Sequence, residues 1–440
     1  MDTPFQISGR YFWRNGRERP RVGLLFEGTT ELDLVSDDEA ATRLAHDMRA
    51  ASDVADFVGV RPGPQVRDGA VSLAAAQLDL GVVYPVDVRT KANRRHQLAE
   101  YASAGVRGLI VYRCGSELHS PGDARAIESH WIDFAHDIDW PCAVLASGAL
   151  ARRGSVLRGL ARASDACGVT LRRVDLEGPS RLADLSLVAR LLSVRVEDEP
   201  AILDLDTVHG CARAAALSIA CGYGLILAPA ASADTLRPVV GALPDHLDAP
   251  TVEPVATFLS DCNEGDSIHE DPVQGSLVLL KEATGRDARF CFQDRPDLPK
   301  PTFLWVCAHG GLTPAAWTRL QAIVHSGCHA VLSCFEPNDS QRDKFAALET
   351  APHAEIPVAT STFDRRRLGK GSLTLLGGAF EHEPRRPEHV DVVRSLARAA
   401  GLPCHESEIA RGDRPVRSLH FSEGAIDATA NSSLAWRAAD

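Results

Sequence analysis

Short apolar runs alternate along the chain with segments that have a helical pattern. The runs are apolar throughout instead of alternating with polar residues, which is typical of strands buried on both faces of a parallel sheet. In the first part of the chain these predicted strands cover residues 21–26, 54–60, 78–83, 108–112, 143–146 and 169–174.

Helical segments separate these predicted strands. Ser36 and Glu39 form a capping box, which predicts a helix from there to about residue 49. Further helices are predicted near residues 91–103, 123–136 and 155–166. Regular alternation of strand and helix indicates a doubly wound α/β domain. The turn-forming residues 177–180 mark its predicted end.

A second series of strands and helices follows this turn. Its predicted strands cover residues 201–203, 224–227, 255–259, 289–292, 302–308 and 330–333. Its clearest helix has Thr313 as N-cap, Pro314 at the first helical position and Gly327 after the last turn. The rest of the chain is less regular, with a strand at 372–376 and a helix at 387–400.

The predicted fold class is therefore α/β, with two doubly wound, parallel-sheet domains of the Rossmann-like type and a smaller C-terminal α+β domain. The length of 440 residues also favours several domains over one core. We predict an N-terminal domain at 1–178, a central domain at 179–335 and a C-terminal domain at 336–440.

Composition narrows the possible partners and the cellular location. Asp and Glu total 59 against 47 Lys and Arg, and a net charge of −12 argues against nucleic acid or an anionic membrane as partner. The first residues lack the apolar core of a signal peptide, and no apolar stretch is long enough to span a membrane. Eleven cysteines without a CxxC pair are typical of free thiols. We therefore predict a cytoplasmic protein.

Polar residues that can bind a ligand follow three of the later predicted strands. They lie in the acidic stretch 260–277, at Asp294, and at 380–383, which includes His382. Ligands of open α/β sheets bind at the carboxyl ends of strands, and carboxylates with a histidine suit Mn²⁺ or Mg²⁺. Such an ion can hold two sugar hydroxyls while a carboxylate moves a proton. The alternative is that these acids are solvated or interact with helix dipoles.

The residues His269 to Leu277 resemble the Cys-Glu-x-Asp-x-x-Gly-Ala-Leu pattern of L-fucose isomerases, with Glu270 on the glutamate of the family. Asp294 follows at the spacing of the family's second acid. The segment 303–310 with His309 resembles its Phe-His-Cys element, and 380–383 resembles its Phe-x-His-His element.

This resemblance to the L-fucose and L-arabinose isomerase-like superfamily implies a metal-dependent aldose–ketose isomerase that acts on an open-chain sugar through an enediol. It implies that Glu270, Asp294 and His382 hold Mn²⁺ and that Glu270 and Asp294 are also the acid/base pair. His309 would hydrogen-bond the sugar substrate, and the protein would be a homo-oligomer. Because Pro272 replaces an aspartate of the motif, a non-catalytic sugar-binding or regulatory protein on the same fold stays open.

A different constellation is also present. His309 follows one predicted strand and Cys334 follows the next, which is how caspase-like cysteine peptidases present their catalytic dyad. A buried, inert thiol is the alternative interpretation of Cys334.

Overall fold

The computed structural model describes most of the chain. The described residues are 6–8, 11–13, 20–26, 37–61, 68–87, 90, 93–106, 108–114, 126–147, 163–176, 181–194, 200–244, 246–247, 250–259, 270–292, 300–307, 312–333, 339–350, 363–404, 415–429 and 433–438. They form two compact units. Unit 1 contains Met1–Thr251 and Pro415–Asp440, and unit 2 contains Val252–Arg414.

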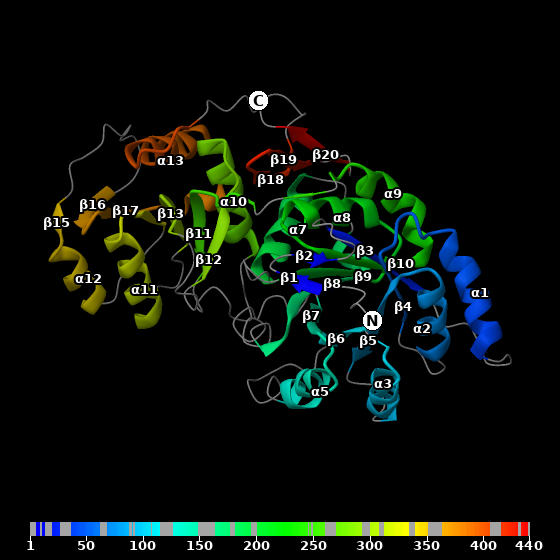
Figure 1. Ribbon diagram of the computed structural model, residues 1–440. Coiled ribbons are helices and arrows are strands. Elements are labelled where there is room, and N and C mark those ends of the chain that lie inside the picture. Colours follow the sequence, from blue (N-terminus) through cyan, green and yellow to red (C-terminus); the bar gives the residue numbers. More distant parts are fainter. Residues whose placement is uncertain are drawn as a thin grey trace. The chain divides into compact units, whose positions relative to one another are not determined.

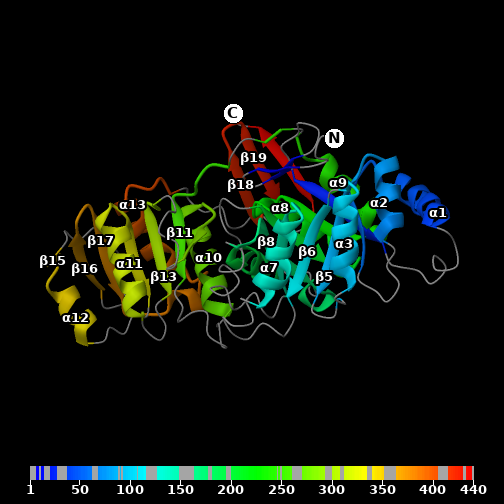
Figure 2. The same cartoon turned by 60° about the horizontal axis from the view of Figure 1, so that its bottom comes forward.

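Unit 1 is built on a closed barrel of eight parallel strands, in the ring order β10-β3-β4-β5-β6-β7-β8-β9 (Figures 1 and 2). The strands are β3 (Arg21–Phe26), β4 (Phe57–Val60), β5 (Gly81–Asp87), β6 (Gly108–Cys114), β7 (Cys142–Ser147), β8 (Ala166–Leu171), β9 (Ala201–Leu205) and β10 (Leu225–Pro229). β10 pairs with both β9 and β3, and these two pairings close the ring.

In the described part of the chain, helical segments follow seven of the eight barrel strands, the exception being β7, after which residues 148–162 are not described. They are α1 (Asp37–Arg49), α2 (Asp68–Gln77), α3 (Asn93–Ser103), η2 (Glu128–Ile132) with α5 (Asp133–Asp137), η4 (Arg173–Leu176), α7 (Arg181–Val194), α8 (Cys211–Ala220), and η5 (Ala230–Ser232) with α9 (Ala233–Gly241). The order strand, helix, strand around a closed parallel ring is that of a (β/α)₈ or TIM barrel.

Apolar side chains fill the barrel from strand to strand. Its interior cluster includes Leu25, Phe57, Val83, Leu109, Val111, Ala143, Leu145, Ala166, Ile202, Leu225 and Leu227. A second cluster packs the outer faces of β4 to β7 against α1, α2, α3 and α5. Both faces of each strand are therefore buried, which explains why the strands are apolar throughout.

Two small antiparallel sheets complete unit 1. β1 (Gln6–Ser8) pairs with β2 (Tyr11–Trp13), and β18 (Arg417–Phe421), β19 (Gly424–Ala428) and β20 (Leu434–Ala438) form a meander. The meander contacts α8 through β18 and β19.

Unit 2 is an open sheet in the order β12-β11-β13-β14-β17-β16-β15. The strands are β11 (Val255–Leu259), β12 (Arg289–Phe292), β13 (Phe303–Cys307), β14 (His329–Ser333), β15 (Glu349–Thr350), β16 (Phe363–Leu368) and β17 (Gly371–Leu376). The first four of these and β17 are parallel, whereas β16 runs antiparallel to β17 and to β15.

Helices cover both faces of this sheet (Figure 2). α11 (Pro314–His325) and α12 (Asp339–Ala346) contribute to a cluster with one face. α10 (Glu270–Thr284) contacts α13 (Pro387–Ala399) and the short η7 (Phe380–His382) on the other. The Thr313 side chain accepts a hydrogen bond from the Ala316 amide, so the predicted N-cap of α11 is confirmed.

The predicted fold class of two doubly wound domains is wrong. Strands on both sides of the predicted domain boundary at 177–180 belong to one barrel, because β8 pairs with all five residues of β9. Among the described residues, the open sheet with parallel strands is in unit 2, which contains residues 252–414.

Candidate active site at the carboxyl end of the barrel

A layer of polar side chains lies above the apolar interior of the barrel. Side chains two residues apart on a strand share a face, so the interior residues Leu109 and Val111 predict that Arg113 also points inward. The same counting places a polar residue near the carboxyl end of five strands: Arg61, Asp87, Arg113, Thr170 and Asp204. Asp206 continues the inward series of β9. Carboxyl ends of barrel strands are where TIM-barrel active sites lie.

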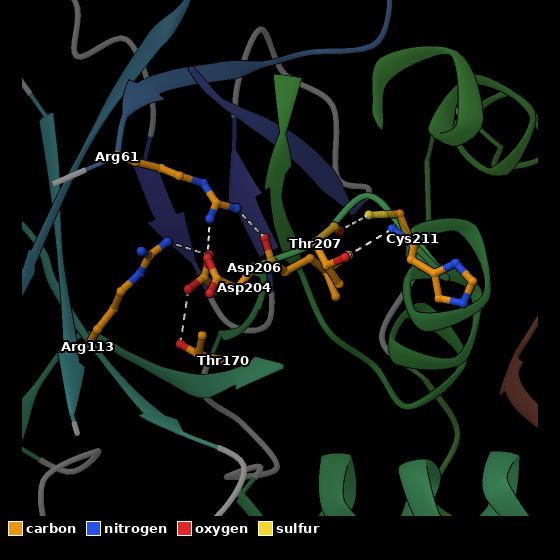
Figure 3. Close-up of polar contacts among 9 residues, drawn as sticks. Arg61, Arg113, Thr170, Asp204, Asp206, Thr207 and Cys211 are labelled. Carbon is orange, nitrogen blue, oxygen red and sulfur yellow. Dashed lines mark hydrogen bonds and ion pairs between the residues drawn. The ribbon is translucent and has the colours of Figure 1, made fainter. Parts of the chain in front are cut away.

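Asp204 is the most deeply buried member of this layer, with no exposed surface. Its Oδ1 accepts a hydrogen bond from Arg113 Nη2 at 2.7 Å, and its Oδ2 accepts one from Thr170 Oγ1 at 3.0 Å (Figure 3). Both carboxylate oxygens thus have a partner. Asp204 joins β6, β8 and β9 and is suited to positioning Arg113.

Asp206 is the exposed carboxylate of the layer, with 42% of its side chain accessible. Arg61, which directly follows β4, forms an ion pair with Asp206 and also donates from Nη2 to the Leu205 carbonyl at 2.8 Å (Figure 3). Two contacts from one guanidinium fix the end of β9 against β4. Asp206 is therefore oriented by a charged neighbour and remains reachable by a ligand.

Asp87 is the last residue of β5 and is half-buried. The Thr90 hydroxyl accepts a hydrogen bond from the Asp87 amide at 2.8 Å. The same hydroxyl donates to Oδ1 of Asp87 at 3.3 Å. In the ring order β5 and β9 lie four strands apart in either direction. Asp87 and Asp206 therefore come from opposite sides of the barrel mouth.

Cys211 is the first residue of α8, the helix that follows β9. Its thiol contacts the Thr207 carbonyl at 2.7 Å and the Ser232 hydroxyl at 3.2 Å. Burial raises the pKa of the Cys211 thiol, although the Ser232 hydrogen bond and the positive charge of Arg61 act in the opposite direction. A thiol of this kind is a poor nucleophile at neutral pH.

No protein-family model matches the sequence, and no curated protein is found as a relative. Solved structures are similar to the chain over nearly all of its length. They include a cold-adapted β-galactosidase from Rahnella sp. R3, with 10% identity and a TM-score of 0.59 over 96% of this chain and 94% of that one. The Gan42B GH42 β-galactosidase from G. stearothermophilus has 11% identity and a TM-score of 0.58 over 97% and 94%.

A third similar structure is the β-galactosidase from Bacillus circulans sp. alkalophilus, at 10% identity, with a TM-score of 0.59 over 94% and 93% of the two chains. At such identities the likeness establishes the fold alone. It still overturns the resemblance to L-fucose and L-arabinose isomerases, because the similar structures are β-galactosidases and unit 1 is a closed barrel. The sugar isomerase function, its fold-based sugar-binding alternative and the caspase-like peptidase are accordingly wrong.

The residues of the predicted isomerase site are only partly described. Glu270 begins α10 and His382 ends η7 as an exposed residue, whereas Asp294, His309 and Cys334 lie outside the described residues. Within the described ranges no group of three His, Cys, Asp or Glu side chains is placed to hold a metal ion. Because Asp294 and the Glu270 side chain lie outside the described part of the chain, the predicted site is not tested, and Mn²⁺ binding stays a prediction.

Sequence reasoning missed every polar residue of the barrel mouth. A signal was present, because Arg61, Asp87 and Arg113 each stand at the end of an apolar strand run. The acidic stretch 260–277 contains more residues that can bind a ligand than the strand ends of the barrel do. For that reason the sequence favoured a site in the second half of the chain. The side-chain direction along β4, β5 and β6 becomes informative only once the strands are known to close a ring.

Proposed function

We propose that the protein is a glycoside hydrolase that acts on a β-galactoside or a related sugar at the carboxyl end of its barrel. The observation that carries this proposal is the similarity to several β-galactosidases from one end of the chain to the other, across both units. The polar layer at the barrel mouth supplies side chains for the reaction. A sugar is therefore still the proposed ligand, but the proposed reaction is hydrolysis of a glycosidic bond instead of isomerisation.

Hydrolysis of a glycosidic bond needs two carboxyl groups on opposite sides of the scissile bond. One protonates the departing oxygen, and the other attacks the anomeric carbon or activates a water molecule. Asp206 and Asp87 meet this requirement best among the described residues, because they come from opposite sides of the barrel and both are accessible. Asp204 is less suitable, since both of its oxygens are engaged.

We assign Asp206 to the role of nucleophile or general base. Its ion pair with Arg61 holds the carboxylate in one orientation, and the Leu205 contact anchors Arg61 in turn. We assign Asp87 to the role of general acid. Arg113, held by Asp204, is then placed to donate hydrogen bonds to hydroxyl groups of the sugar.

The test is hydrolysis of a panel of 4-nitrophenyl β-glycosides, including the galactoside. Asp206→Asn and Asp87→Asn should each lower kcat/KM by at least about 100-fold, the usual scale for loss of an acid or base group. For Asp87→Asn the loss should be larger with a poor leaving group than with 2,4-dinitrophenolate, which needs no protonation. Asp234→Asn is the matched control, because Asp234 is an exposed aspartate of α9 paired with Arg237.

Absence of hydrolysis across the panel, or full activity of Asp206→Asn, would refute the proposal.

No described helix is long and apolar enough to cross a bilayer. The predicted cytoplasmic location and homo-oligomeric state are retained as proposals alongside the hydrolase activity.

A further inference from the structure

A second group of polar side chains lies far from the barrel layer in sequence, on the sheet of unit 2. His329 opens β14 and stands in register with Ser372 of β17. Arg365 of β16 donates from Nε to Ser372 Oγ at 3.2 Å, and His329 Nδ1 lies 2.9 Å from the same oxygen. The Ser372 hydroxyl thus links a guanidinium to an imidazole.

Arg365 is a buried cation, 8% exposed. Across the described ranges its one hydrogen-bond partner is Ser372, and no carboxylate lies within ion-pair distance. Arg21, which is buried to a similar degree, forms a 2.9 Å ion pair with Asp56. Leaving a buried charge without an opposite charge is costly. Consistent with this, burial lowers the pKa of Arg365.

The positions of the hydrogens on Ser372 and His329 follow from the groups that each side chain contacts. Arginine can only donate, so Ser372 Oγ accepts from Arg365 and has its own hydrogen to give. Among the described residues the acceptor for that hydrogen is His329 Nδ1. The proton of the neutral imidazole must then be on Nε2. Burial and the nearby Arg365 both lower the pKa of His329, which favours this neutral form at pH 7.

The group therefore offers donors and no acceptor to a ligand. The Nη groups of Arg365 and the Nε2 hydrogen of His329 are uncommitted within the described part of the chain. Arg367 lies two residues beyond Arg365, on the same face of β16, and is in register with Ser372. Arg367 is exposed and adds a second positive charge beside the group.

We propose that His329, Arg365 and Ser372 form a binding site for an oxyanion of the phosphate class, either free phosphate or a phosphate group of a larger ligand. The planar fork of a guanidinium matches phosphate oxygens, and a charge-assisted hydrogen bond is about twice as strong as a neutral one. A bound anion supplies the negative charge that the described surroundings of Arg365 lack. The site is independent of the proposed hydrolase activity.

The experiment is calorimetric titration of the full chain with inorganic phosphate at constant ionic strength, so that unspecific screening is the same throughout. Wild type should bind phosphate saturably, and Arg365→Gln should weaken binding by at least about 10-fold, which corresponds to one charged hydrogen bond. Arg366→Gln is the matched control. Arg366 is the next residue, on the opposite face of β16, and is already paired with Asp364.

A second titration with galactose 6-phosphate separates the two sources. Tighter binding than inorganic phosphate indicates a phosphate group of a larger ligand, and equal binding indicates the free ion. Without anion, Arg365→Gln should unfold at the same temperature as wild type or higher, because the substitution removes an uncompensated charge. The proposal is overturned if wild type binds neither ligand, or if Arg365→Gln and Arg366→Gln weaken binding equally.

Discussion

Asp204 provides a direct test of how the barrel mouth is held together. Substitution by alanine leaves Arg113 and Thr170 without their acceptor inside the barrel. Removing one partner of a buried ion pair costs about 3–5 kcal/mol. Since the Arg113 side chain is 16% exposed, water compensates in part, and we expect the lower end, about 3 kcal/mol. An asparagine side chain would retain an acceptor and add a donor in the same shape, so Asp204→Asn should cost about 1–2 kcal/mol.

Hydrogen–deuterium exchange of backbone amides measures this locally. A single free energy of unfolding is poorly defined for a chain with two units, whereas exchange reports on each strand separately. A loss of about 3 kcal/mol should speed exchange in β8 and β9 by about 100-fold or more, because about 1.36 kcal/mol is tenfold. Peptides from β13 and β14 of unit 2 serve as the internal control.

The double variant Arg113→Met/Asp204→Leu separates an ion pair from simple loss of volume. It removes both charges and restores apolar packing, so its exchange rates should return most of the way to wild type. The reasoning is refuted if Asp204→Ala leaves exchange in β9 unchanged. It is equally refuted if the two single substitutions add up in the double variant, because contacting partners must show coupling.

Two further predictions concern packing and thiol chemistry. A Cβ at Gly168 would lie 1.8 Å from the Ile202 carbonyl oxygen, so Gly168→Ala should lower stability by about 1–3 kcal/mol and reduce the melting temperature. Gly241→Ala, where a Cβ meets nothing within 4 Å, is the control and should leave the melting temperature unchanged or raise it. Because burial raises the pKa of Cys211, iodoacetamide should label it slowly at pH 8 and faster as pH rises, as measured by mass spectrometry. Labelling of Cys211 at pH 8 as fast as a free cysteine would contradict this.

Local patterns predicted most strands but not the way they assemble. The predicted ranges 255–259 and 289–292 coincide with β11 and β12, and 21–26 coincides with β3. An open sheet and a closed barrel both need strands that are apolar on two faces. The distinction depends on whether β10 pairs with β3, and these segments are about two hundred residues apart in sequence. No local signal encodes that pairing.

The site was harder to predict than the elements for a related reason. Glu270 and Asp294 matched a spacing, but two acids at a given separation occur easily by chance in a chain with 59 acidic residues. The ion pair of Arg61 with Asp206 joins residues that lie far apart in sequence and meet because β4 and β9 end at one rim. The side-chain direction that places them inward follows from the closed ring.

The chain leaves unit 1 after Thr251 and returns to it at Pro415. The two crossing points are neighbours within unit 1, because the Thr251 amide donates to the His420 carbonyl at 2.8 Å. Unit 2 is thus an insertion between the last barrel helix and the β18–β20 meander. During synthesis the barrel strands emerge first, yet the meander that covers α8 must wait for the whole insertion. Two insertion points this close to each other are compatible with gain or loss of an inserted domain during evolution. A short linker that joins residue 251 to residue 415 is therefore a rational way to produce unit 1 without unit 2.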